Sequence, residues 1–465
     1  MSARLERSGV FALALLGITL AAIGIRMLAL EAGGTLLATG DEDYYFQTAV
    51  EIAREGRHLY PPRGALAEWP PGYPYFLSLF VPGGSEVSAE AIVARLVAAQ
   101  IGLGGLLVAL CGALGRAWFG AREGLVAASL AALYPNFVVF SHYLFSETLF
   151  SALILVALLG VVRFEERPTA GVLVLSGVAL GLATLTRELA LPVAGVCAAW
   201  WVFRASPGAR PRAVGHAIAL LAVIAAIVVP WTLRNDRVLG SPVLVSNAGW
   251  LNLRSGNSLS ETDWMRPAGF ELEAFRRTYF AIPDEMERAD YARSQALVLI
   301  GEEQPAWIFK KAVRTAALLA SPDSYLFKKI SRGAYPELGP DAIRVLLVVV
   351  PASTLVLLLL ALPAWAADRR RGRRELVATL ALAVFAIHLL ANASVRYRLP
   401  WMPLAVLYAA SMLSDPRRVL ASIGTRSRAG VAVLGLLLLL TGVPYFWPDA
   451  VSLFETGRYR EAMRP

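Results

Sequence analysis

Residues 10–30 read VFALALLGITLAAIGIRMLAL, and Gly-Asp-Glu-Asp-Tyr-Tyr follows at residues 40–45. An apolar run of roughly 20 residues is long enough to cross the hydrocarbon core of a bilayer as a helix. Backbone polar groups inside lipid must pair within their own segment, which favours a helix for this run. The carboxylates of Asp41, Glu42 and Asp43 are therefore expected just beyond the membrane, next to an amphipathic helical stretch at 45–55.

The composition extends this pattern to the whole chain. Of 465 residues, 57% are hydrophobic and only 17% are charged, a combination that soluble domains rarely have. The first run resembles a signal peptide, but its length and the lack of a convincing cleavage site predict a retained helix. Further apolar runs lie near 91–115, 123–141, 147–163, 171–186, 189–203, 213–233, 342–365, 375–391, 399–413 and 430–446. The sequence thus predicts an all-α polytopic transmembrane helical bundle of about eleven spans.

The apolar runs divide the chain into three parts. Residues 1–235 form an N-terminal transmembrane module, and its first loop, 31–90, carries the acidic cluster and amphipathic helices. Residues 236–341 are mostly polar and form a second large loop region. Residues 342–465 contain the C-terminal transmembrane helices and a short tail.

Basic residues predict the orientation of the bundle. The formal net charge of +9 could indicate nucleic-acid binding, but the arginines gather in short loops between apolar runs, as in proteins oriented by the positive-inside rule. With a cytoplasmic N-terminus, the alternation of eleven spans places all the basic short loops in the cytoplasm: 116–122, 163–167, 204–212, 369–374 and 417–428. Both large loops and the C-terminal tail are then extracytoplasmic, in an inner-membrane protein that binds no nucleic acid.

Three arginines depart from this rule, since Arg187, Arg396 and Arg398 lie at the outer ends of their spans. Ionisable groups at membrane depth usually face a cavity or a partner. Phosphate is a natural partner, because the planar guanidinium matches its oxygens. For Arg187 the alternatives are pairing with Glu188 or contact with lipid headgroups.

The acidic residues of the outer loops are candidates for chemistry. Asp41 is the candidate base that deprotonates or orients an acceptor hydroxyl, and Asp43 is its substitute. Glu68 and Glu147 could join either of them around a divalent metal ion, because hard cations prefer oxygen ligands. The plain alternatives are a solvated acidic loop and, for Glu147, an acid placed at a helix N-terminus by the dipole.

Sugar recognition has weaker candidates. Tyr44 adjoins the acidic cluster, while Asn252 and Asn257 lie in a stretch rich in amides and glycines that suits either sugar binding or turns. The two cysteines, Cys111 and Cys197, lie in apolar runs, which excludes a disulfide framework. The sequence has no Walker loop, no dinucleotide-binding fingerprint and no nucleophile elbow, so nucleotide-sugar or ATP chemistry in a soluble domain is not supported.

Several short motifs together resemble a known superfamily. In chain order they are 40–44 (GDEDY), 70–74 (PPGYP), 146–150 (SETLF), 186–188 (TRE), 230–235 (PWTLRN) and 396–400 (RYRLP). As a set they are similar to the GT-C superfamily of polytopic glycosyltransferases, in particular to the protein mannosyltransferases and the lipid A aminoarabinose transferases.

The resemblance implies a polyprenyl-phosphate-sugar donor and transfer on the extracytoplasmic face. It matches Asp41 to the family's catalytic aspartate, Glu68 to a position that helps hold a metal in some members, and Glu147 to the acid that opens the fourth span. It matches Arg396 and Arg398 to basic positions suited to the donor phosphate. The expected acceptor is a hydroxyl on a protein, a lipid or a glycan. The large C-terminal soluble domain of the oligosaccharyltransferases has no counterpart in this sequence.

Two other functions remain open from the sequence. A lipid-linked sugar flippase would also need a phosphate-binding arginine cavity, although no symmetry between two halves is visible. An O-antigen-ligase-like enzyme would share the outer arginine but would not need the carboxylates after the first span. The convergence of acids and arginines on the outer face favours the glycosyltransferase.

Overall fold

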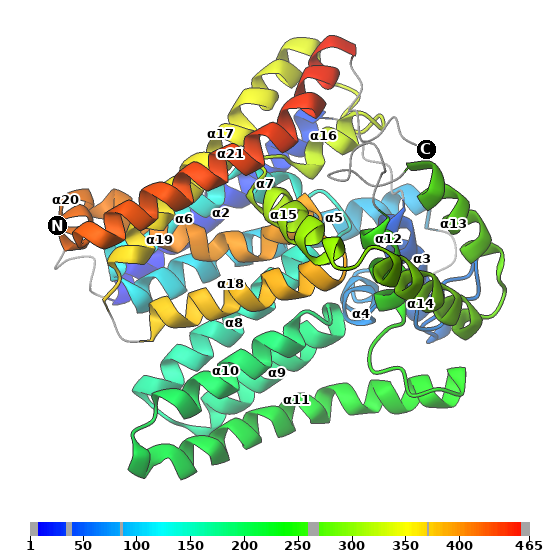
Figure 1. Ribbon diagram of the computed structural model, residues 1–465, viewed down its shortest axis with the longest axis horizontal. Helices are drawn as coiled ribbons and strands as arrows, with labels where there is room; N and C mark the ends of the chain where they lie inside the picture. Colours follow the sequence, from blue (N-terminus) through cyan, green and yellow to red (C-terminus); the bar gives the residue numbers. More distant parts are fainter. Residues whose placement is uncertain (1–7, 34–39, 84–86, 259–268, 370–371, 457–465) are drawn as a thin grey trace.

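The structure is a computed structural model that describes residues 8–33, 40–83, 87–258, 269–369 and 372–456. Within these ranges the chain is helical, and the only extended pairing is an isolated bridge between Tyr60 and Ala65. This confirms the all-α expectation. The apolar helices lie side by side along the long axis of the molecule, and shorter helices gather at one end (Figure 1).

Each predicted span coincides with an apolar helix. These are α2 (Ser8–Gly33), α5 (Ala89–Trp118), α6 (Ala121–Leu133), α8 (Glu147–Glu166), α9 (Ala170–Thr186), α10 (Ala190–Arg204), α11 (Arg210–Leu239), α17 (Pro340–Ala367), α18 (Arg373–Leu390), α19 (Met402–Ser414) and α21 (Thr425–Thr456). The short α7 (Pro135–Val139) continues the α6 segment. Among the described residues, six helices are long and apolar enough to cross a membrane, while α9 and α10 are shorter apolar helices. The chain is an integral membrane protein, and eleven spans remains the predicted number.

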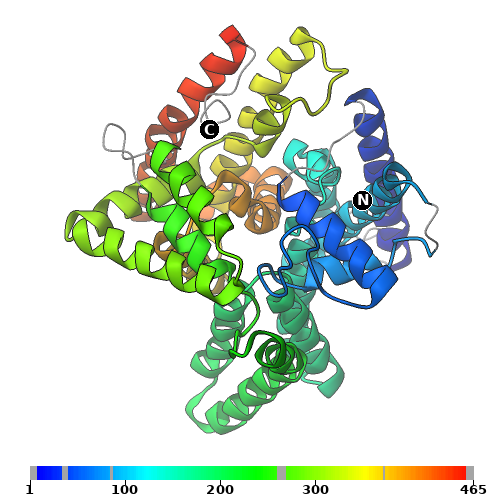
Figure 2. The ribbon, with the colours of Figure 1, turned by 90° about the vertical axis from the view of Figure 1, so that its right-hand side faces the viewer.

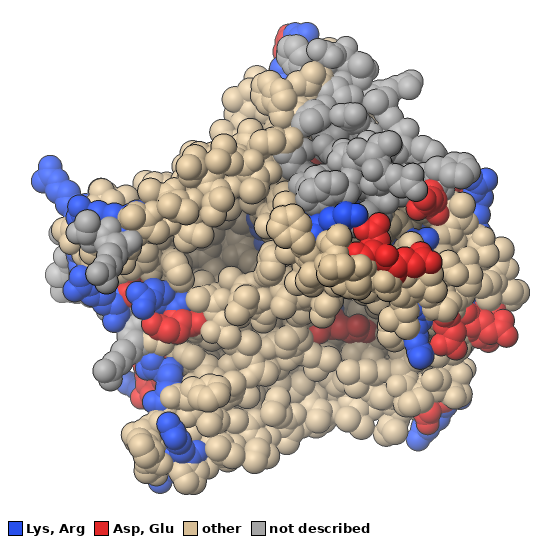
Figure 3. Space-filling model, in the orientation of Figure 1, with Lys and Arg blue, Asp and Glu red and all other residues tan. Residues whose placement is uncertain are grey.

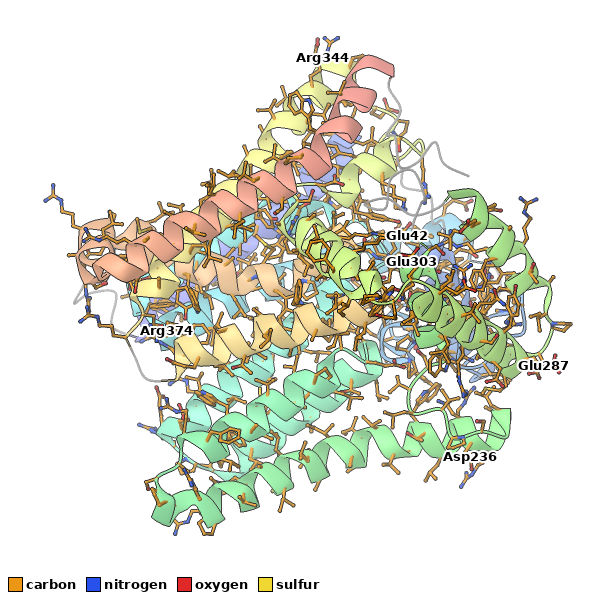
Figure 4. The ribbon with its side chains drawn as sticks, viewed as in Figure 1. Glu42, Asp236, Glu287, Glu303, Arg344 and Arg374 are labelled. Atoms are coloured by element: carbon orange, nitrogen blue, oxygen red, sulfur yellow. The ribbon has the colours of Figure 1, made fainter. Side chains whose placement is uncertain are left out.

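The basic loops share one end of the bundle. The end of α10 and the start of α11, the end of α17 and the start of α18, and the short α20 (Pro416–Ser422) lie at the left in Figure 1. Figure 3 shows Lys and Arg gathered there and a largely uncharged band beside it. Arg374 extends from this end, whereas Asp236 and Glu287 lie at the opposite one (Figure 4). Three of the predicted basic segments therefore lie at the same end of the bundle.

The opposite end carries the remaining helices. They are α3 (Asp41–Glu55), α4 (Gly72–Ser78), α12 (Ala248–Asn257), α13 (Gly269–Ala281), α14 (Glu285–Glu302), α15 (Ala306–Ala320) and α16 (Tyr325–Ile330). Seen end-on in Figure 2, α3 in blue and the green helices of the second loop region flank the centre of the bundle. A small separate core formed by Leu251, Phe275, Tyr279 and Ala292 holds α12, α13 and α14 together.

The two outer loops are tied together by one buried carboxylate. Glu285, at the start of α14, accepts hydrogen bonds from the backbone amides of Leu66 (2.6 Å) and Ala67 (2.9 Å) and from Asn247 Nδ2 (2.9 Å). The backbone amide of Asn247 also donates a hydrogen bond to the Ala67 carbonyl oxygen at 3.0 Å. Because buried polar groups are costly when unpaired, this cluster fixes the segments on either side of it.

Candidate active site

The acidic cluster begins helix α3, and the helix separates its members. Asp41, Glu42 and Asp43 form the first turn, where the helix dipole favours negative charge. Successive side chains on a helix point about 100° apart, so the three carboxylates meet different surroundings. Asp41 is the one of the three that lines the cavity described below.

Glu42 and Asp43 have structural partners. Buried Glu42 forms an ion pair with Lys329 of α16 and accepts from the Leu144 amide at 3.3 Å, and Figure 4 shows it inside the molecule. Asp43 accepts hydrogen bonds from Tyr60 Oη at 2.8 Å and from Gln47 Nε2 at 3.3 Å. The structure does not place Asp43 at the cavity, so Asp41 is the carboxylate in a position to act.

Arg396 and Arg187 lie beside two of the predicted carboxylates, Asp41 and Glu147, which come from distant parts of the chain. Arg396 Nη2 lies 2.6 Å from Asp41 Oδ2, and its Nε lies 3.5 Å from Glu147 Oε1. Arg187 Nη1 lies 3.0 Å from the same Glu147 oxygen and 3.0 Å from Ser146 Oγ. Two cations and two anions therefore form one cluster. Its most distant members in sequence, Asp41 and Arg396, are 355 residues apart.

Helix ends bring these four groups together. Glu147 opens α8, Arg187 follows the last residue of α9, and Arg396 lies in a short 3₁₀ segment, η2 (Val395–Trp401), after α18. The Tyr397 ring lies against both guanidinium groups, 5.0 Å from Arg187 and 5.2 Å from Arg396. Stacking of this kind restrains an arginine without neutralising it.

Asp41, Arg187 and Arg396 line a cavity of about 170 Å³, while Glu147 pairs with the two arginines and does not itself line it. Its lining includes Asp41, Tyr45, Trp69, Ser146, Thr186, Arg187, Glu188, Ser246, Asn252, His388, Asn392, Arg396 and Tyr397. Pockets for drug-sized ligands usually measure roughly 300–1,000 Å³, so the enclosed part suits a group no larger than one sugar unit. The first outer loop, the second outer region and the ends of α9 and α18 all contribute to it.

Close backbone approaches hold these walls in place. A Cβ at Gly72, the first residue of α4, would lie 2.7 Å from Thr186 Oγ1, and a Cβ at Gly256 of α12 would lie 2.7 Å from Asn392 Cα. Only glycine permits such contacts. The first loop is thereby seated against the end of α9, and α12 against the segment that follows α18.

The acidic groups of the cavity differ in their electrostatics. Burial acts to raise the pKa of Asp41, but the Arg396 and Arg187 guanidinium groups lower it below its ordinary value. Burial raises the pKa of Glu188, which the hydrogen bonds from Ser246 only partly offset. An opposite charge and desolvation act in opposite directions on a carboxylate, so the two acids are suited to different tasks.

Arg398 does not belong to the cavity, contrary to the expectation of a phosphate ligand. Its guanidinium is buried and donates to the backbone carbonyl oxygens of Leu319 (3.1 Å), Ser321 and Asp323 (3.1 Å). These carbonyls form the turn between α15 and α16. Arg398 therefore stabilises that turn. Arg187, and not Arg398, lines the cavity together with Arg396.

This contact set predicts a stability defect. Replacing Arg398 by Met would remove the guanidinium that donates to the carbonyl oxygens of Leu319, Ser321 and Asp323, and a buried polar group left unsatisfied costs about 1–3 kcal/mol. We expect Arg398→Met to lower the midpoint of thermal unfolding in detergent, and any folded fraction to bind lipid phosphate like the wild type. An unchanged midpoint with lost phosphate binding would contradict this assignment.

Two other predicted substrate ligands lie away from the cavity. Buried Tyr44 packs against Tyr45, Tyr60 and Trp69 with ring centroids 4.8–6.2 Å apart. Asn257 accepts from Trp307 Nε1 at 2.7 Å and donates to the Leu253 and Leu390 carbonyl oxygens. Asn252 does line the cavity. Neighbours that the sequence analysis did not single out, Tyr45 and Glu188, lie there as well, and the 186–188 motif was the only signal for Glu188.

The residues expected to hold a metal do not fit one. Glu68 pairs with Arg63 Nη2 at 3.0 Å and lies 3.9 Å from Arg288 Nη2, while Glu147 lies between Arg187 and Arg396. In the described parts of the chain no three His, Cys, Asp or Glu side chains group as metal ligands. Guanidinium groups already occupy the positions beside these carboxylates where a cation would bind.

Comparison with known proteins gives a family match over part of the chain and structures of similar fold. Residues 68–233 match the family of dolichyl-phosphate-mannose-protein mannosyltransferases, and no curated protein matches the chain. A crystal structure of the Archaeoglobus fulgidus oligosaccharyltransferase with Zn and sulfate is similar, with TM-score 0.54 and 16% identity over 94% of this chain and 52% of that chain. The structure of AglB from the same organism with an inhibitory peptide and a dolichol-phosphate gives 0.52 and 16%, over 95% and 56%.

ArnT from Cupriavidus metallidurans, solved with undecaprenyl phosphate bound, is also similar, with TM-score 0.51 and 15% identity over 93% of this chain and 64% of that chain. The chain thus spans little more than half the length of the oligosaccharyltransferase structures it matches. The matched region 68–233 contains Glu147, Arg187 and Glu188, whereas Asp41 and Arg396 lie outside it. In fold, and over 68–233 in sequence, the chain resembles the GT-C superfamily of polytopic glycosyltransferases, with the protein mannosyltransferases and ArnT among its relatives.

Proposed function

We propose that the protein is a membrane glycosyltransferase that moves a sugar from a polyprenyl-phosphate donor to an acceptor hydroxyl on the extracytoplasmic face. The observation that carries the proposal is that Asp41, Arg187 and Arg396 line one small cavity, with Glu147 paired to both arginines. The relatives solved with dolichol-phosphate and with undecaprenyl phosphate support a lipid phosphate as the leaving group. Acceptors of three kinds, protein, lipid or glycan, can supply the hydroxyl.

The location follows from the distribution of charge. Helices α3 and α12, which line the cavity, lie at the end of the bundle opposite the basic loops (Figure 1), and basic short loops are retained in the cytoplasm. We therefore place the N-terminus in the cytoplasm and the cavity outside it, in the inner membrane of the cell. A lipid-linked donor can reach such a site from the outer leaflet.

In the proposed reaction, the acceptor oxygen attacks the anomeric carbon of the donor in a single inverting displacement. The bond between that carbon and the phosphate oxygen breaks, and its electron pair leaves with the lipid phosphate. Asp41 takes the proton of the attacking hydroxyl. Arg396 and Arg187 stabilise the charge that develops on the phosphate.

The ion pair between Asp41 and Arg396 couples donor binding to this proton transfer. In the structure the 2.6 Å ion pair with Arg396 favours the ionised form of Asp41 and engages its carboxylate. A donor phosphate that binds Arg396 competes with Asp41 for the guanidinium. The carboxylate is then released, its pKa rises, and it becomes a better base when the donor is in place.

A transfer assay tests the proposal. Purified protein in proteoliposomes would be incubated with acceptors and a panel of polyprenyl-phosphate sugars, and free polyprenyl phosphate would be measured. We expect one donor to release lipid phosphate, and the release to persist in Arg374→Gln, which changes an exposed arginine at the opposite end. A flippase would move a donor across the bilayer without cleaving it, and that outcome would reject the transferase.

Chelation gives a separate prediction. Because guanidinium groups provide the cationic stabilisation of the leaving phosphate, we expect EDTA to change turnover by less than about twofold. Turnover would be measured before and after chelation and after Mg²⁺, Mn²⁺ or Zn²⁺ is returned. Loss of activity restored by one of these ions would show that a metal is needed.

A further inference from the structure

Glu188 differs from Asp41, the other carboxylate that lines the cavity, and from Glu147, which pairs with Arg187 and Arg396. Asp41 and Glu147 are each within 3.5 Å of a guanidinium nitrogen. Glu188 Oε1 instead accepts two neutral hydrogen bonds from Ser246, from its backbone amide at 2.7 Å and from its Oγ at 2.9 Å. Its second oxygen, Oε2, has no hydrogen bond or ion pair to any residue that the structure describes. Glu188 is thus oriented through one oxygen, and the other remains available in the cavity.

Two amides share this property. Asn252 of α12 and Asn392, just after α18, line the same cavity. Within the described ranges, neither side chain makes a hydrogen bond to the protein. All three side chains are half-buried, so a ligand in the cavity can reach them, and placed polar groups of this kind orient a ligand in its pocket. They come from three separate elements.

The elements that carry these groups are fixed without a ligand. Buried Lys311 donates to the carbonyl oxygens of Gly256 (2.7 Å) and Ala391 (3.0 Å), which joins α12 to the end of α18. Glu285 holds Asn247, next to Ser246, against the first outer loop. The open oxygen and the two amides therefore sit on a rigid frame, as a preorganised binding site requires.

The cavity consequently has two chemically different walls. One wall contains the ion-paired groups Asp41, Arg187 and Arg396, which suit a phosphate and the reacting atoms. The other contains Glu188, Asn252 and Asn392, which present acceptors together with amide donors. Sugar hydroxyls both donate and accept hydrogen bonds, so the second wall complements a polyhydroxylated ring and not an anion.

We propose that Glu188, with Asn252 and Asn392, binds hydroxyl groups of the sugar being transferred and sets which sugar the protein accepts. This inference rests on the proposed function, because it assumes a sugar joined to the phosphate at Arg396. Burial raises the pKa of Glu188, because it disfavours the charged carboxylate. A sugar hydroxyl that donates a hydrogen bond to the carboxylate stabilises the charged form. Glu188 is then a binding residue, and Asp41 retains the proton transfer.

The competing explanation is that Glu188 only fastens the loop at Ser246. Two variants separate the explanations. Glu188→Gln keeps a carbonyl oxygen that can accept from Ser246 but replaces the open oxygen by an NH₂ group. Ser246→Ala removes the hydrogen bond from Ser246 Oγ to Glu188 Oε1 and leaves Glu188 Oε2 unchanged.

Binding to two kinds of probe tests the proposal. Dissociation constants would be measured in detergent for undecaprenyl phosphate, and for a panel of undecaprenyl-phosphate sugars from which the tightest is used. For Glu188→Gln we expect the affinity for the bare lipid phosphate to stay within about twofold, and the affinity for the sugar-bearing lipid to fall about tenfold, since a site built for a hydroxyl loses much when the match is broken. Asn252→Ala and Asn392→Ala should behave in the same way with smaller losses. Ser246→Ala should bind both probes like the wild type.

The outcomes distinguish this inference from the proposed function. Equal losses for both probes in Glu188→Gln, or the same losses in Ser246→Ala, would show a structural role and overturn the inference. A wild type that binds the sugar-bearing lipids no better than the bare phosphate would also overturn it. If the wild type bound no lipid phosphate at all, the proposed function itself would fail. Arg396→Gln, which should weaken both probes, is the positive control.

Discussion

The Asp41→Asn variant is expected to bind the lipid phosphate more tightly than the wild type and yet to turn over at least a hundredfold more slowly. Asparagine cannot accept the proton of the acceptor hydroxyl, and general bases typically contribute about 10²–10⁴-fold. Asparagine also lacks the negative charge that pairs with the Arg396 guanidinium at 2.6 Å. We expect an affinity gain of about threefold, since a partly exposed ion pair contributes less than about 1 kcal/mol.

Calorimetry with undecaprenyl phosphate and a transfer assay would measure the two effects separately. Asp43→Asn is the matched control, because Asp43 lies on the same helix, bonded to Tyr60, and away from the cavity. Its affinity and turnover should be those of the wild type. Turnover near the wild-type level in Asp41→Asn would reject Asp41 as the base. Weaker binding in that variant would mean that Asp41 positions Arg396 and does not compete with the phosphate.

Replacing Arg396 is expected to damage both binding and turnover. Arg396→Gln removes the guanidinium that reaches Asp41 and Glu147, and with it the charge that stabilises the departing phosphate. Loss of one preorganised group of this kind commonly reduces turnover by about 10²–10³-fold. We expect that loss, together with weaker affinity for undecaprenyl phosphate. Glu147 keeps Arg187 at 3.0 Å, so the variant should remain folded.

Two arginine variants provide the comparison. Arg396→Lys should recover only part of the activity, because an ammonium group cannot match phosphate oxygens in the bidentate way of a guanidinium. Arg398→Met should lose stability instead, since Arg398 bonds the turn between α15 and α16. Thermal unfolding and transfer would be measured on all three proteins. The same phenotype in Arg396→Gln and Arg398→Met would contradict the division of roles.

The order and extent of the helices could be predicted from local sequence. Apolar runs of span length must become helices in lipid, and the observed helices α8, α9 and α10 begin and end within a few residues of the predicted ones. The basic loops could be assigned to one end because charge alternates with each span. That Asp41 and Arg396 would share a chamber was also a consequence of topology, since both lie at the same end of the bundle.

Only the tertiary structure decided which neighbour in each motif faces that chamber. Asp41, Glu42 and Asp43 are chemically alike in sequence, but about 100° of rotation per residue sends them to three different partners. Arg396 and Arg398 lie two residues apart on a 3₁₀ segment, which has about three residues per turn, so they cannot point the same way. The sequence by itself therefore determined the helical bundle and the kinds of residue at the end that carries the cavity. The packing of α3, α8, α9 and α18 determined which carboxylate meets which guanidinium, because side-chain direction depends on contacts between segments hundreds of residues apart.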